Sequence, residues 1–382
     1  MTSCGSTYIH PTPFRLESGE IIPNATLRYQ TYGELNDARD NVLVICHALT
    51  GNASLHSWWG GLLGPNRAFD TNDYFVVCAN ILGSCYGSTS PMFENPDCED
   101  GKVYGINFPD VSVQDGVRLQ IELLKNELNI TSVKSVIGGS FGGMQALEYA
   151  VQAGSTNSSG EEKKHGEPFL RSAIPIACGA YHTAWQVAIS ETQRQAIYAD
   201  PKWRGGDVDI DDPPLSGLSV ARQIGMVSYR SPTAYETKFG RRIRPTTTPS
   251  SSPPPTEPKY GQHAQWEVKS YLKYQGHKFL TRFDPITYVK LTEQMDSHDI
   301  TRNRNHHDSS GVEEVLGKIH IPTLVLGIDS DVLYPLYLQE QLVDALPNGR
   351  LGVVKSDAGH DGFLLEQEQV SRFIEQFLEE LD

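Results

Sequence analysis

Two hydrophobic periods alternate along this chain, one typical of buried strands and one typical of amphipathic helices. Short apolar runs rich in β-branched residues predict strands at residues 27–33, 41–46, 74–79 and 171–178. Apolar residues recur at helical spacing over 113–128. The alternation returns near the C-terminus, where strands are expected at 321–327 and 350–354 and a helix at 336–346. This order of elements predicts an α/β fold with a mostly parallel sheet.

The stretch from about residue 183 to 306 breaks the alternation, because its pattern is largely helical. It is also too long for an ordinary connection between a strand and a helix. We therefore predict a first core segment at 1–180, an inserted helical lid at 181–310 and a second core segment at 311–382. Within the lid, the Pro/Ser/Thr-rich run 245–258 is expected to be disordered or extended. The polar run 153–168 predicts a surface loop.

One serine lies where an apolar strand turns into a helix. Gly138, Ser140 and Gly142 form a G-x-S-x-G motif, which follows the strand residues 135–137 and precedes apolar residues at helical spacing. Glycines beside Ser140 suit so sharp a turn, and Gly143 lets the helix pack closely under the strand. The alternative is a chance motif in which Ser140 is only a helix N-cap. The strand–turn–helix context favours a nucleophile elbow with Ser140 as the nucleophile.

A serine nucleophile on an α/β-hydrolase fold needs an acid and then a histidine later in the chain. Asp331 follows the strand expected at 321–327, so we predict it as the acid, with Asp329 as the fallback. His360 is the one histidine C-terminal to Asp331. It would deprotonate Ser140, while Asp331 would hold the imidazole in the right tautomer and stabilise its charged form. The alternative for His360 is a loop histidine that caps a helix.

The tetrahedral intermediate of acyl transfer needs hydrogen-bond donors for its oxyanion. One would be the backbone N–H of Phe141, directly after the nucleophile, and the other should come from the loop after an early strand. That loop follows the strand at 41–46, which makes the backbone N–H of Leu49 the second expected donor. Thr50 beside it is placed to contact the substrate. We expect His47 to be structural rather than a second base.

Composition narrows the classes of function. At 382 residues the chain can form one large domain with an insertion. Its net charge of −15 argues against binding to nucleic acid, so an anionic cofactor would need a local concentration of positive charge. Six cysteines without a pairing pattern predict reduced thiols in a cytoplasmic protein. We expect no membrane-spanning helix, and no metal site, because His306 and His307 have no third ligand nearby in the sequence.

Several short motifs together resemble the homoserine O-acetyltransferase family over nearly the whole chain. They are His47–Gly51, Trp58-Trp59, the elbow at 138–144, and the segments 194–197, 200–201, 229–231, 239–241 and 359–361. The early segment 40–92 resembles the fungal branch most closely. In that family the fold is an α/β-hydrolase with a helical lid. The resemblance implies a ping-pong acyltransferase of methionine biosynthesis, in which acetyl-CoA acylates the serine and L-homoserine accepts the acetyl group, with no permanently bound cofactor.

The resemblance also implies an acceptor site. Arg222 and Tyr229 match the family's substrate-binding arginine and tyrosine, and Asp361 matches its ammonium-binding aspartate. Seven residues span about two helical turns, so Arg222 and Tyr229 would face one side. Without the resemblance, they would be taken as a surface arginine and a core tyrosine. The family further suggests a homodimer built through the lid helices.

The resemblance defines the acyl-transfer reaction more narrowly than the identity of the donor and the acceptor. Relatives with the same machinery acylate serine or a hydroxymethyl cephem, and some use a succinyl donor. A plain serine hydrolase is a second alternative, which would lack the recognition pair of Arg222 and Asp361 and would not need CoA. A catalytically inactive binding protein is a third, which a complete triad disfavours.

Overall fold

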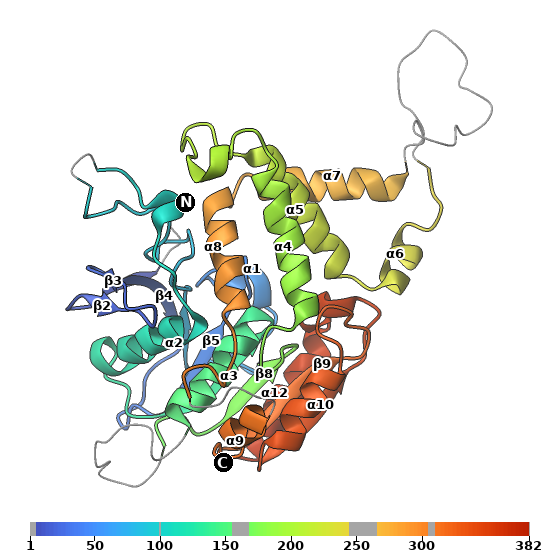
Figure 1. Ribbon diagram of the computed structural model, residues 1–382. Coiled ribbons are helices and arrows are strands. Elements are labelled where there is room, and N and C mark those ends of the chain that lie inside the picture. Colours follow the sequence, from blue (N-terminus) through green and yellow to red (C-terminus); the bar gives the residue numbers. More distant parts are fainter. Residues whose placement is uncertain (1–4, 99–100, 155–167, 244–265, 305–309, 382) are drawn as a thin grey trace.

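The fold is centred on one twisted sheet, shown in Figure 1. The computed structural model describes residues 5–98, 101–154, 168–243, 266–304 and 310–381. Within these residues, eight strands form the sheet in the order β1 (Ser6–Ile9), β4 (Thr26–Tyr32), β6 (Phe75–Ala79), β5 (Val42–Cys46), β7 (Val133–Gly139), β8 (Ala173–Ile176), β9 (Thr323–Ile328) and β10 (Gly349–Val354). A short hairpin, β2 (Phe14–Arg15) and β3 (Ile21–Ile22), lies outside it.

Most of the sheet is parallel. The six strands from β6 to β10 in the spatial order pair in parallel, whereas β4 pairs with both β1 and β6 in antiparallel register. Carboxyl ends of parallel strands meet at one edge, where loops can assemble a site. The mostly parallel sheet expected from the hydrophobic pattern is therefore confirmed, and the predicted strands coincide with β4 to β10 within a few residues.

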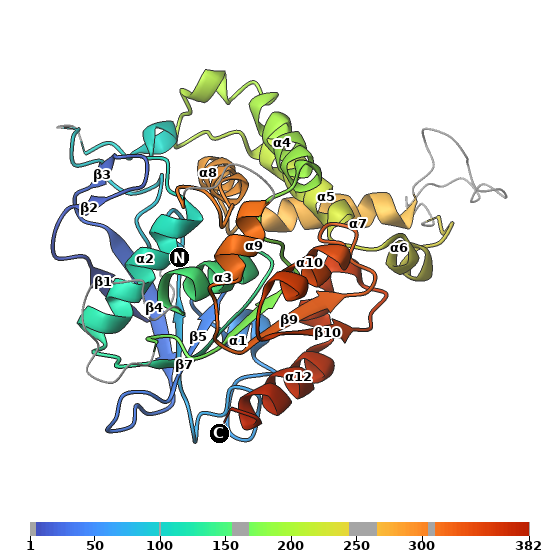
Figure 2. The same cartoon turned by 60° about the horizontal axis from the view of Figure 1, so that its bottom comes forward.

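Along a single strand, alternate side chains pack into two separate cores on the two faces of the sheet. In β5, Val42, Val44 and Cys46 belong to one core, and Leu43 and Ile45 belong to the other. Because side chains on a strand point alternately to opposite faces, one run of apolar residues serves both. Helices α2 (Val113–Glu122), α3 (Phe141–Ala153) and α10 (Tyr337–Ala345) cover the first face, and α1 (His56–Trp59) and α12 (Gln367–Glu379) cover the second (Figure 2).

The helix expected at 113–128 forms with a change in its last turn. Ser112 caps it, since its hydroxyl accepts the N–H of Asp115 while the Asp115 carboxylate accepts the N–H of Ser112. After Glu122 the chain continues as a π-helical turn, η2 (Leu123–Glu127), closed by a bond from Leu128 N–H to Leu123 O of 3.1 Å.

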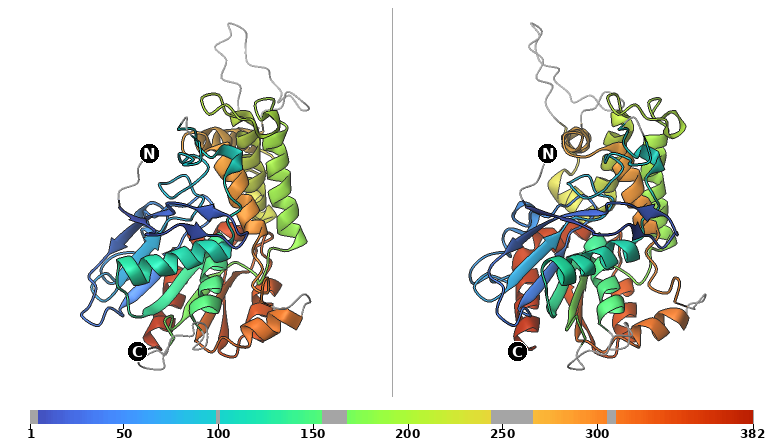
Figure 3. Two further views of the ribbon diagram at one scale, coloured as in Figure 1. Left: turned by 60° about the vertical axis from the view of Figure 1, so that its left-hand side comes forward. Right: turned by 90° about the vertical axis from the view of Figure 1, so that its left-hand side faces the viewer.

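Among the described residues between β8 and β9, five helices lie above the carboxyl ends of the strands (Figures 1 and 3). They are α4 (Ala184–Tyr198), α5 (Leu215–Ser228), α6 (Pro232–Lys238), α7 (Glu267–Phe279) and α8 (Pro285–Asp296). Ile197, Leu218, Phe279 and Tyr288 join the first core, so α4, α5, α7 and α8 pack on the same apolar cluster as α2 and α3. The remaining short elements are η1 (Gly105–Asn107), η3 (Arg204–Gly206), α9 (Ser310–Leu316), η4 (Gly359–Asp361) and α11 (Gly362–Leu365).

Two expectations from the sequence concern segments that the structure does not describe. The run 245–258 and nearly all of the expected loop at 153–168 lie outside the described residues. The division into segments 1–180, 181–310 and 311–382 stays a prediction. Among the helices that are described, none is both long and apolar enough to cross a membrane.

Candidate active site

Ser140 lies at the sharp turn between β7 and α3. Its backbone has φ 58° and ψ −122°, a conformation that costs energy in any residue other than glycine. The neighbouring glycines permit it, since a Cβ on Gly138 would lie 2.3 Å from the carbonyl oxygen of Gly142, and one on Gly142 would lie 2.0 Å from that of Cys46. The Ser140 side chain makes no capping bond to the helix. The alternative of a simple N-cap therefore does not describe its hydroxyl.

The structure brings Ser140, His360 and Asp331 together across 220 positions of sequence. His360 Nε2 lies 2.8 Å from Ser140 Oγ, and His360 Nδ1 lies 2.7 Å from Asp331 Oδ2. All three residues are buried. A serine bonded to an imidazole that is itself oriented by a carboxylate is the arrangement that activates a hydroxyl nucleophile.

Asp331 and Asp329 both follow β9, but only Asp331 reaches the histidine. Its second oxygen, Oδ1, accepts the backbone N–H groups of Leu333 and Tyr334, each at 2.8 Å, which fixes the carboxylate. The carboxylate of Asp329 instead accepts the N–H of Ser356 at 3.0 Å. The chain turns after β9, with a bond of 3.1 Å from Asp331 N–H to Ile328 O, and this turn gives the two carboxylates different partners.

Burial and charge act in opposite directions on His360. Desolvation lowers the pKa of its imidazole, whereas the charge and hydrogen bond of Asp331 and the charge of Asp361 raise it. The pKa of His360 is raised as the net result. The site therefore favours the imidazolium that forms when the histidine takes a proton.

Aromatic rings hold the imidazole on several sides. Tyr334 stacks on His360 with 5.1 Å between ring centroids, and Phe363 meets it edge-on at 5.5 Å. Tyr229, one of the expected substrate-binding residues, lies 6.1 Å away by the same measure. These contacts restrict the orientation of the ring and exclude water from its faces.

The expected oxyanion donors belong to two backbone segments, the start of α3 and the turn after β5. Phe141 is the first residue of α3, so its N–H belongs to the helix terminus that has no intrahelical partner. Leu49 lies in a turn closed by a bond of 2.8 Å from Gly51 N–H to Ala48 O. His47 precedes this turn, and its ring nitrogens contact Asn80 Oδ1 at 3.0 Å and Ala48 O at 2.9 Å. Both nitrogens are occupied, as expected of a structural histidine.

An arginine that the sequence analysis did not single out contacts the same turn. Arg282 lies between α7 and α8, and its Nη1 donates to Thr50 O at 2.9 Å and to the hydroxyl of Tyr86 at 3.1 Å. Its Nη2 lies 3.5 Å from Thr50 Oγ1. Thr50, expected beside the substrate, is therefore tied to the helices above the site. No local motif marks Arg282, since its partners lie far away in the sequence.

The expected acceptor residues gather near the histidine. The Arg222 guanidinium lies 5.7 Å from the centre of the Tyr229 ring and 5.0 Å from that of Phe279. Among the residues that the structure describes, no carboxylate forms an ion pair with Arg222. A half-buried cation on two aromatic rings is suited to bind a carboxylate from a small molecule.

Asp361 has a protein partner that the sequence analysis missed. Arg230 Nε lies 2.9 Å from Asp361 Oδ2. Burial raises the pKa of Asp361, while the charges of Arg230, His360 and Arg222 lower it, and the net direction is upward. Arg230 directly follows Tyr229 and belongs to the motif at 229–231, and these are the signals that could have placed it near the site.

Comparison with known proteins identifies the family. A model of the alpha/beta hydrolase fold matches residues 41–367. A homoserine O-acetyltransferase of Nostoc punctiforme is 43% identical over 95% of this chain and 93% of its own length. Another, from the fungus Emericella nidulans, is 36% identical over 98% of this chain and 86% of its own length. This chain belongs to the homoserine O-acetyltransferase family.

Solved structures agree with this family at the level of the fold. A homoserine O-acetyltransferase from Staphylococcus aureus matches with a TM-score of 0.72 at 28% identity, over 98% of this chain and 94% of that one. Esterase E22 matches with a TM-score of 0.79 at 23% identity, over 98% and 99% of the two chains, and this likeness shows the fold alone. The expected α/β-hydrolase fold is confirmed. The similarity to a fungal relative is present, although the Nostoc relative shares the higher identity.

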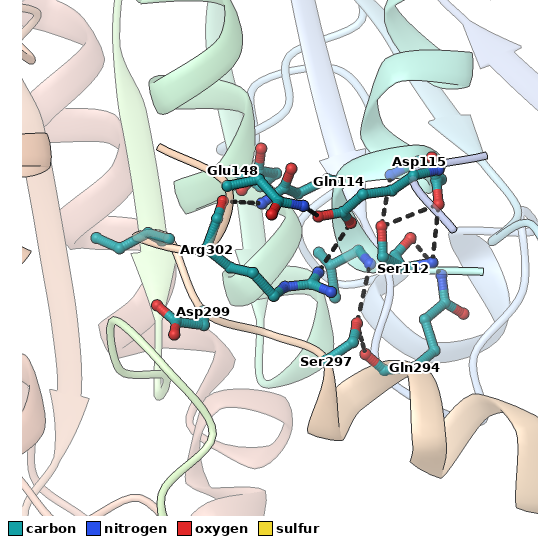
Figure 4. Close-up of polar contacts among 12 residues, drawn as sticks. Ser112, Gln114, Asp115, Glu148, Gln294, Ser297, Asp299 and Arg302 are labelled. Carbon is teal, nitrogen blue, oxygen red and sulfur yellow. Dashed lines mark hydrogen bonds and ion pairs between the residues drawn. The ribbon is translucent and has the colours of Figure 1, made fainter. Parts of the chain in front are cut away.

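One cavity of this family member lies away from the triad. It has a volume of about 730 Å³ and is lined by residues of the β2–β3 region, the segment before α2, and α8. Figure 4 shows the polar contacts beside it, where Gln294 Nε2 donates to Ser112 O at 3.1 Å and Gln114 Nε2 donates to Arg302 O at 3.2 Å. These bonds join α2 to the end of α8 and its following loop, so they serve the packing of the fold.

Within the described ranges, no cluster of three or more His, Cys, Asp or Glu side chains is arranged to hold a metal ion. The absence of a metal cofactor stays a prediction. The described site offers a serine, a histidine and carboxylates, together with backbone donors and the three arginines Arg222, Arg230 and Arg282.

Proposed function

We propose that this protein transfers an acetyl group from acetyl-CoA to the side-chain hydroxyl of L-homoserine through an acetylated Ser140. The observation that carries the proposal is the chain of hydrogen bonds from Ser140 through His360 to Asp331. Its high similarity to homoserine O-acetyltransferases supports the choice of reaction. The catalytic roles given to the three residues are part of the proposal.

In the first half-reaction the serine takes the acetyl group. His360 Nε2 accepts the proton of Ser140 Oγ as this oxygen forms a bond to the thioester carbonyl carbon. Backbone N–H groups of Leu49 and Phe141 stabilise the resulting oxyanion. The tetrahedral intermediate then breaks its carbon–sulfur bond, and the CoA thiolate leaves with the proton from His360.

In the second half-reaction the acetyl group moves from Ser140 to the acceptor, by the same steps in reverse order. His360 takes the proton of the homoserine hydroxyl, whose oxygen attacks the acetyl carbonyl carbon. The same N–H groups hold the second oxyanion. Its collapse breaks the bond to Ser140 Oγ, which recovers a proton from His360. Asp331 keeps the imidazole oriented through both halves.

Selection of an amino-acid acceptor rests on groups of opposite charge near His360. Arg222 binds the acceptor carboxylate in this proposal, because the Arg222 guanidinium has no ion-pair partner among the described residues. Asp361 binds the ammonium group of the acceptor, although its carboxylate also forms an ion pair with Arg230. A carboxylate shared by a guanidinium and an ammonium can keep both hydrogen bonds, because it has two oxygens.

The experiment that tests the proposal separates the two half-reactions. Purified protein is mixed with acetyl-CoA alone, and mass spectrometry of its peptides is expected to find an acetyl adduct on Ser140. Ser140→Ala is expected to lose both the adduct and turnover. An adduct on another residue, in protein that still turns over, would show that the nucleophile is assigned wrongly.

The choice of substrates is tested in the same assay. Product formation is measured with L-homoserine, L-serine and a neutral alcohol as acceptors, and with acetyl-CoA and succinyl-CoA as donors. Transfer is expected to be fastest from acetyl-CoA to L-homoserine. Preference for L-serine or for succinyl-CoA would replace the proposed acceptor or donor, and release of acetate to water alone would indicate an esterase. Action in the cytoplasm, in methionine biosynthesis and as a homodimer through α4 to α8 are further expectations of the proposal.

A further inference from the structure

Positive charge is concentrated in one part of this acidic chain. The whole sequence has 32 lysines and arginines against 47 aspartates and glutamates. The described residues 230–243 and 266–282 reverse this balance, with only Glu236 and Glu267 as acids. Their cationic residues are Arg230, Lys238, Arg241, Arg242, Lys269, Lys273, Lys278 and Arg282. Such a local excess marks a surface that attracts anions.

The cations of α6 and of the segment after it lie on aromatic rings. Lys238 Nζ is 4.5 Å from the centre of the Tyr271 ring and 5.4 Å from that of Phe239. The Arg241 guanidinium is 5.0 Å from the centre of the Trp266 ring. Lys238 and Arg241 are exposed. Charged groups and ring faces thus reach solvent from the same surface.

This surface is continuous with the reaction centre. A small hollow on it is lined by Arg230, Ala234, Tyr235, Lys238, Phe239 and Tyr271. Arg230 forms the ion pair with Asp361, which directly follows His360. Ser231, the N-cap of α6, donates to the carbonyl of Asp357 on the loop that carries His360. Arg230 and Ser231 thus join this surface to the loop that carries His360.

The cavity of about 730 Å³ beside α2 and α8 does not offer the same charge. Its lining contains Glu17, Asp110, Glu293 and Asp296, and its cations Lys290 and Arg302 are each already paired with one of these acids. A ligand with several negative charges would be repelled there. Of the two, only the region of α6 and α7 is complementary to such a ligand.

We infer that the α6–α7 surface, formed by Arg230, Tyr235, Lys238, Arg241, Trp266 and Tyr271, binds the phosphorylated adenosine end of the CoA donor. This inference rests on the proposed function. Phosphate groups pair with the lysine and arginine side chains, and the purine stacks on an aromatic ring. The thioester arm then runs past Arg230 toward Ser140.

Charge reversal tests the inference with two donors. Lys238→Glu and Arg241→Glu are compared with Arg372→Glu, which reverses an exposed cation on α12. Acetyl-CoA is compared with S-acetyl-N-acetylcysteamine, a thioester without phosphates or purine. Each α6–α7 variant is expected to raise the KM for acetyl-CoA about tenfold, with kcat and the use of the short thioester nearly unchanged. Arg372→Glu is expected to leave both donors unaffected.

Competitive inhibition by the nucleotide end of CoA gives a second measurement. Adenosine 3′,5′-bisphosphate is expected to inhibit wild type competitively against acetyl-CoA, less strongly at high salt and less strongly in Lys238→Glu. Tyr271→Leu keeps the charges and removes a ring, and it is expected to weaken the same inhibitor. If wild type uses acetyl-CoA and the variants keep its KM and the inhibition, the inference is wrong and the proposed function stands. If wild type is not acetylated by acetyl-CoA at all, the proposed function fails first. If a variant loses activity with acetyl-CoA and with the short thioester to the same degree, the surface does not act on the nucleotide alone, and the inference is wrong.

Discussion

Arg282 donates a hydrogen bond of 2.9 Å to the carbonyl oxygen of Thr50, a residue 232 positions earlier in the chain. Thr50 follows Leu49 in the turn that is expected to supply an oxyanion donor, and Arg282 belongs to the corner between α7 and α8. The helices above the site and the turn beneath them are therefore joined by a charge-assisted bond. We expect the position of Leu49 N–H to depend on this contact.

Arg282→Ala is expected to lower kcat about tenfold to a hundredfold in both half-reactions, because an oxyanion forms in each and a displaced donor stabilises both less well. Arg282→Lys is expected to recover part of the rate, since an ammonium can still donate to Thr50 O. Stopped-flow measurement of CoA release without acceptor, followed by steady-state transfer, separates the two halves.

Tyr86→Phe is the matched control, because it removes the other Arg282 contact, at 3.1 Å, and leaves the bond to Thr50. It is expected to cost less than Arg282→Ala. If Arg282→Ala raises only the KM for L-homoserine, the arginine binds the acceptor and does not position the turn.

Asp331→Asn is expected to reduce kcat by about 10⁴-fold, because an amide presents an N–H or a weaker acceptor to His360 and favours the wrong tautomer. Asp329→Asn is expected to change kcat far less, since its carboxylate accepts the N–H of Ser356 and does not contact His360. Steady-state kinetics of the two variants side by side decide between them. The reverse ranking would exchange the roles of the two aspartates.

Arg222→Ala is expected to cost about 2–5 kcal/mol in kcat/KM for L-homoserine, because the acceptor carboxylate loses its partner in a confined site. Acetylation of Ser140 by the donor should stay nearly intact. A burst of CoA release without acceptor is compared with transfer to L-homoserine and to a neutral alcohol. Loss of the burst to the same degree as transfer would mean that Arg222 serves the donor or the fold.

The rate should depend on pH through His360. Asp331 and Asp361 more than offset the lowering effect of burial, so the pKa of His360 lies above its ordinary value of 6.5. A general base must be unprotonated, and the acidic limb of kcat/KM for acetyl-CoA is therefore expected above pH 6.5. Asp361→Asn removes one raising charge and should move that limb to lower pH. A wild-type limb at or below pH 6.5 would contradict the assignment of His360 as the base.

Local patterns were enough to predict most elements and the nucleophile. Alternating apolar residues in a strand, and glycines around one serine, act within a few residues of chain. The strands β5, β7 and β9 and the turn at Ser140 follow from such patterns. The order of Ser140, Asp331 and His360 also restricted the triad, since the nucleophile elbow requires its partners later in the sequence.

Other features could not be read from the sequence, because they depend on how distant segments dock. The sequence favoured Asp331 over Asp329 because Asp331 lies just before a turn into the next helix, but which carboxylate contacts His360 depends on packing across 29 positions. The bond from Arg282 to Thr50 and the ion pair of Arg230 with Asp361 likewise join the helices above the site to loops of the sheet.

The sequence by itself thus determined the sheet, the elbow and the candidate nucleophile and base, because these depend on backbone conformation and on the faces of single elements. Only the tertiary structure decided which charges meet. Lys238 and Tyr271 lie on opposite sides of a segment outside the described residues, yet their side chains come within 4.5 Å. Hydrogen bonds and ion pairs need distances of a few ångströms, and the packing of helices on the sheet sets these distances.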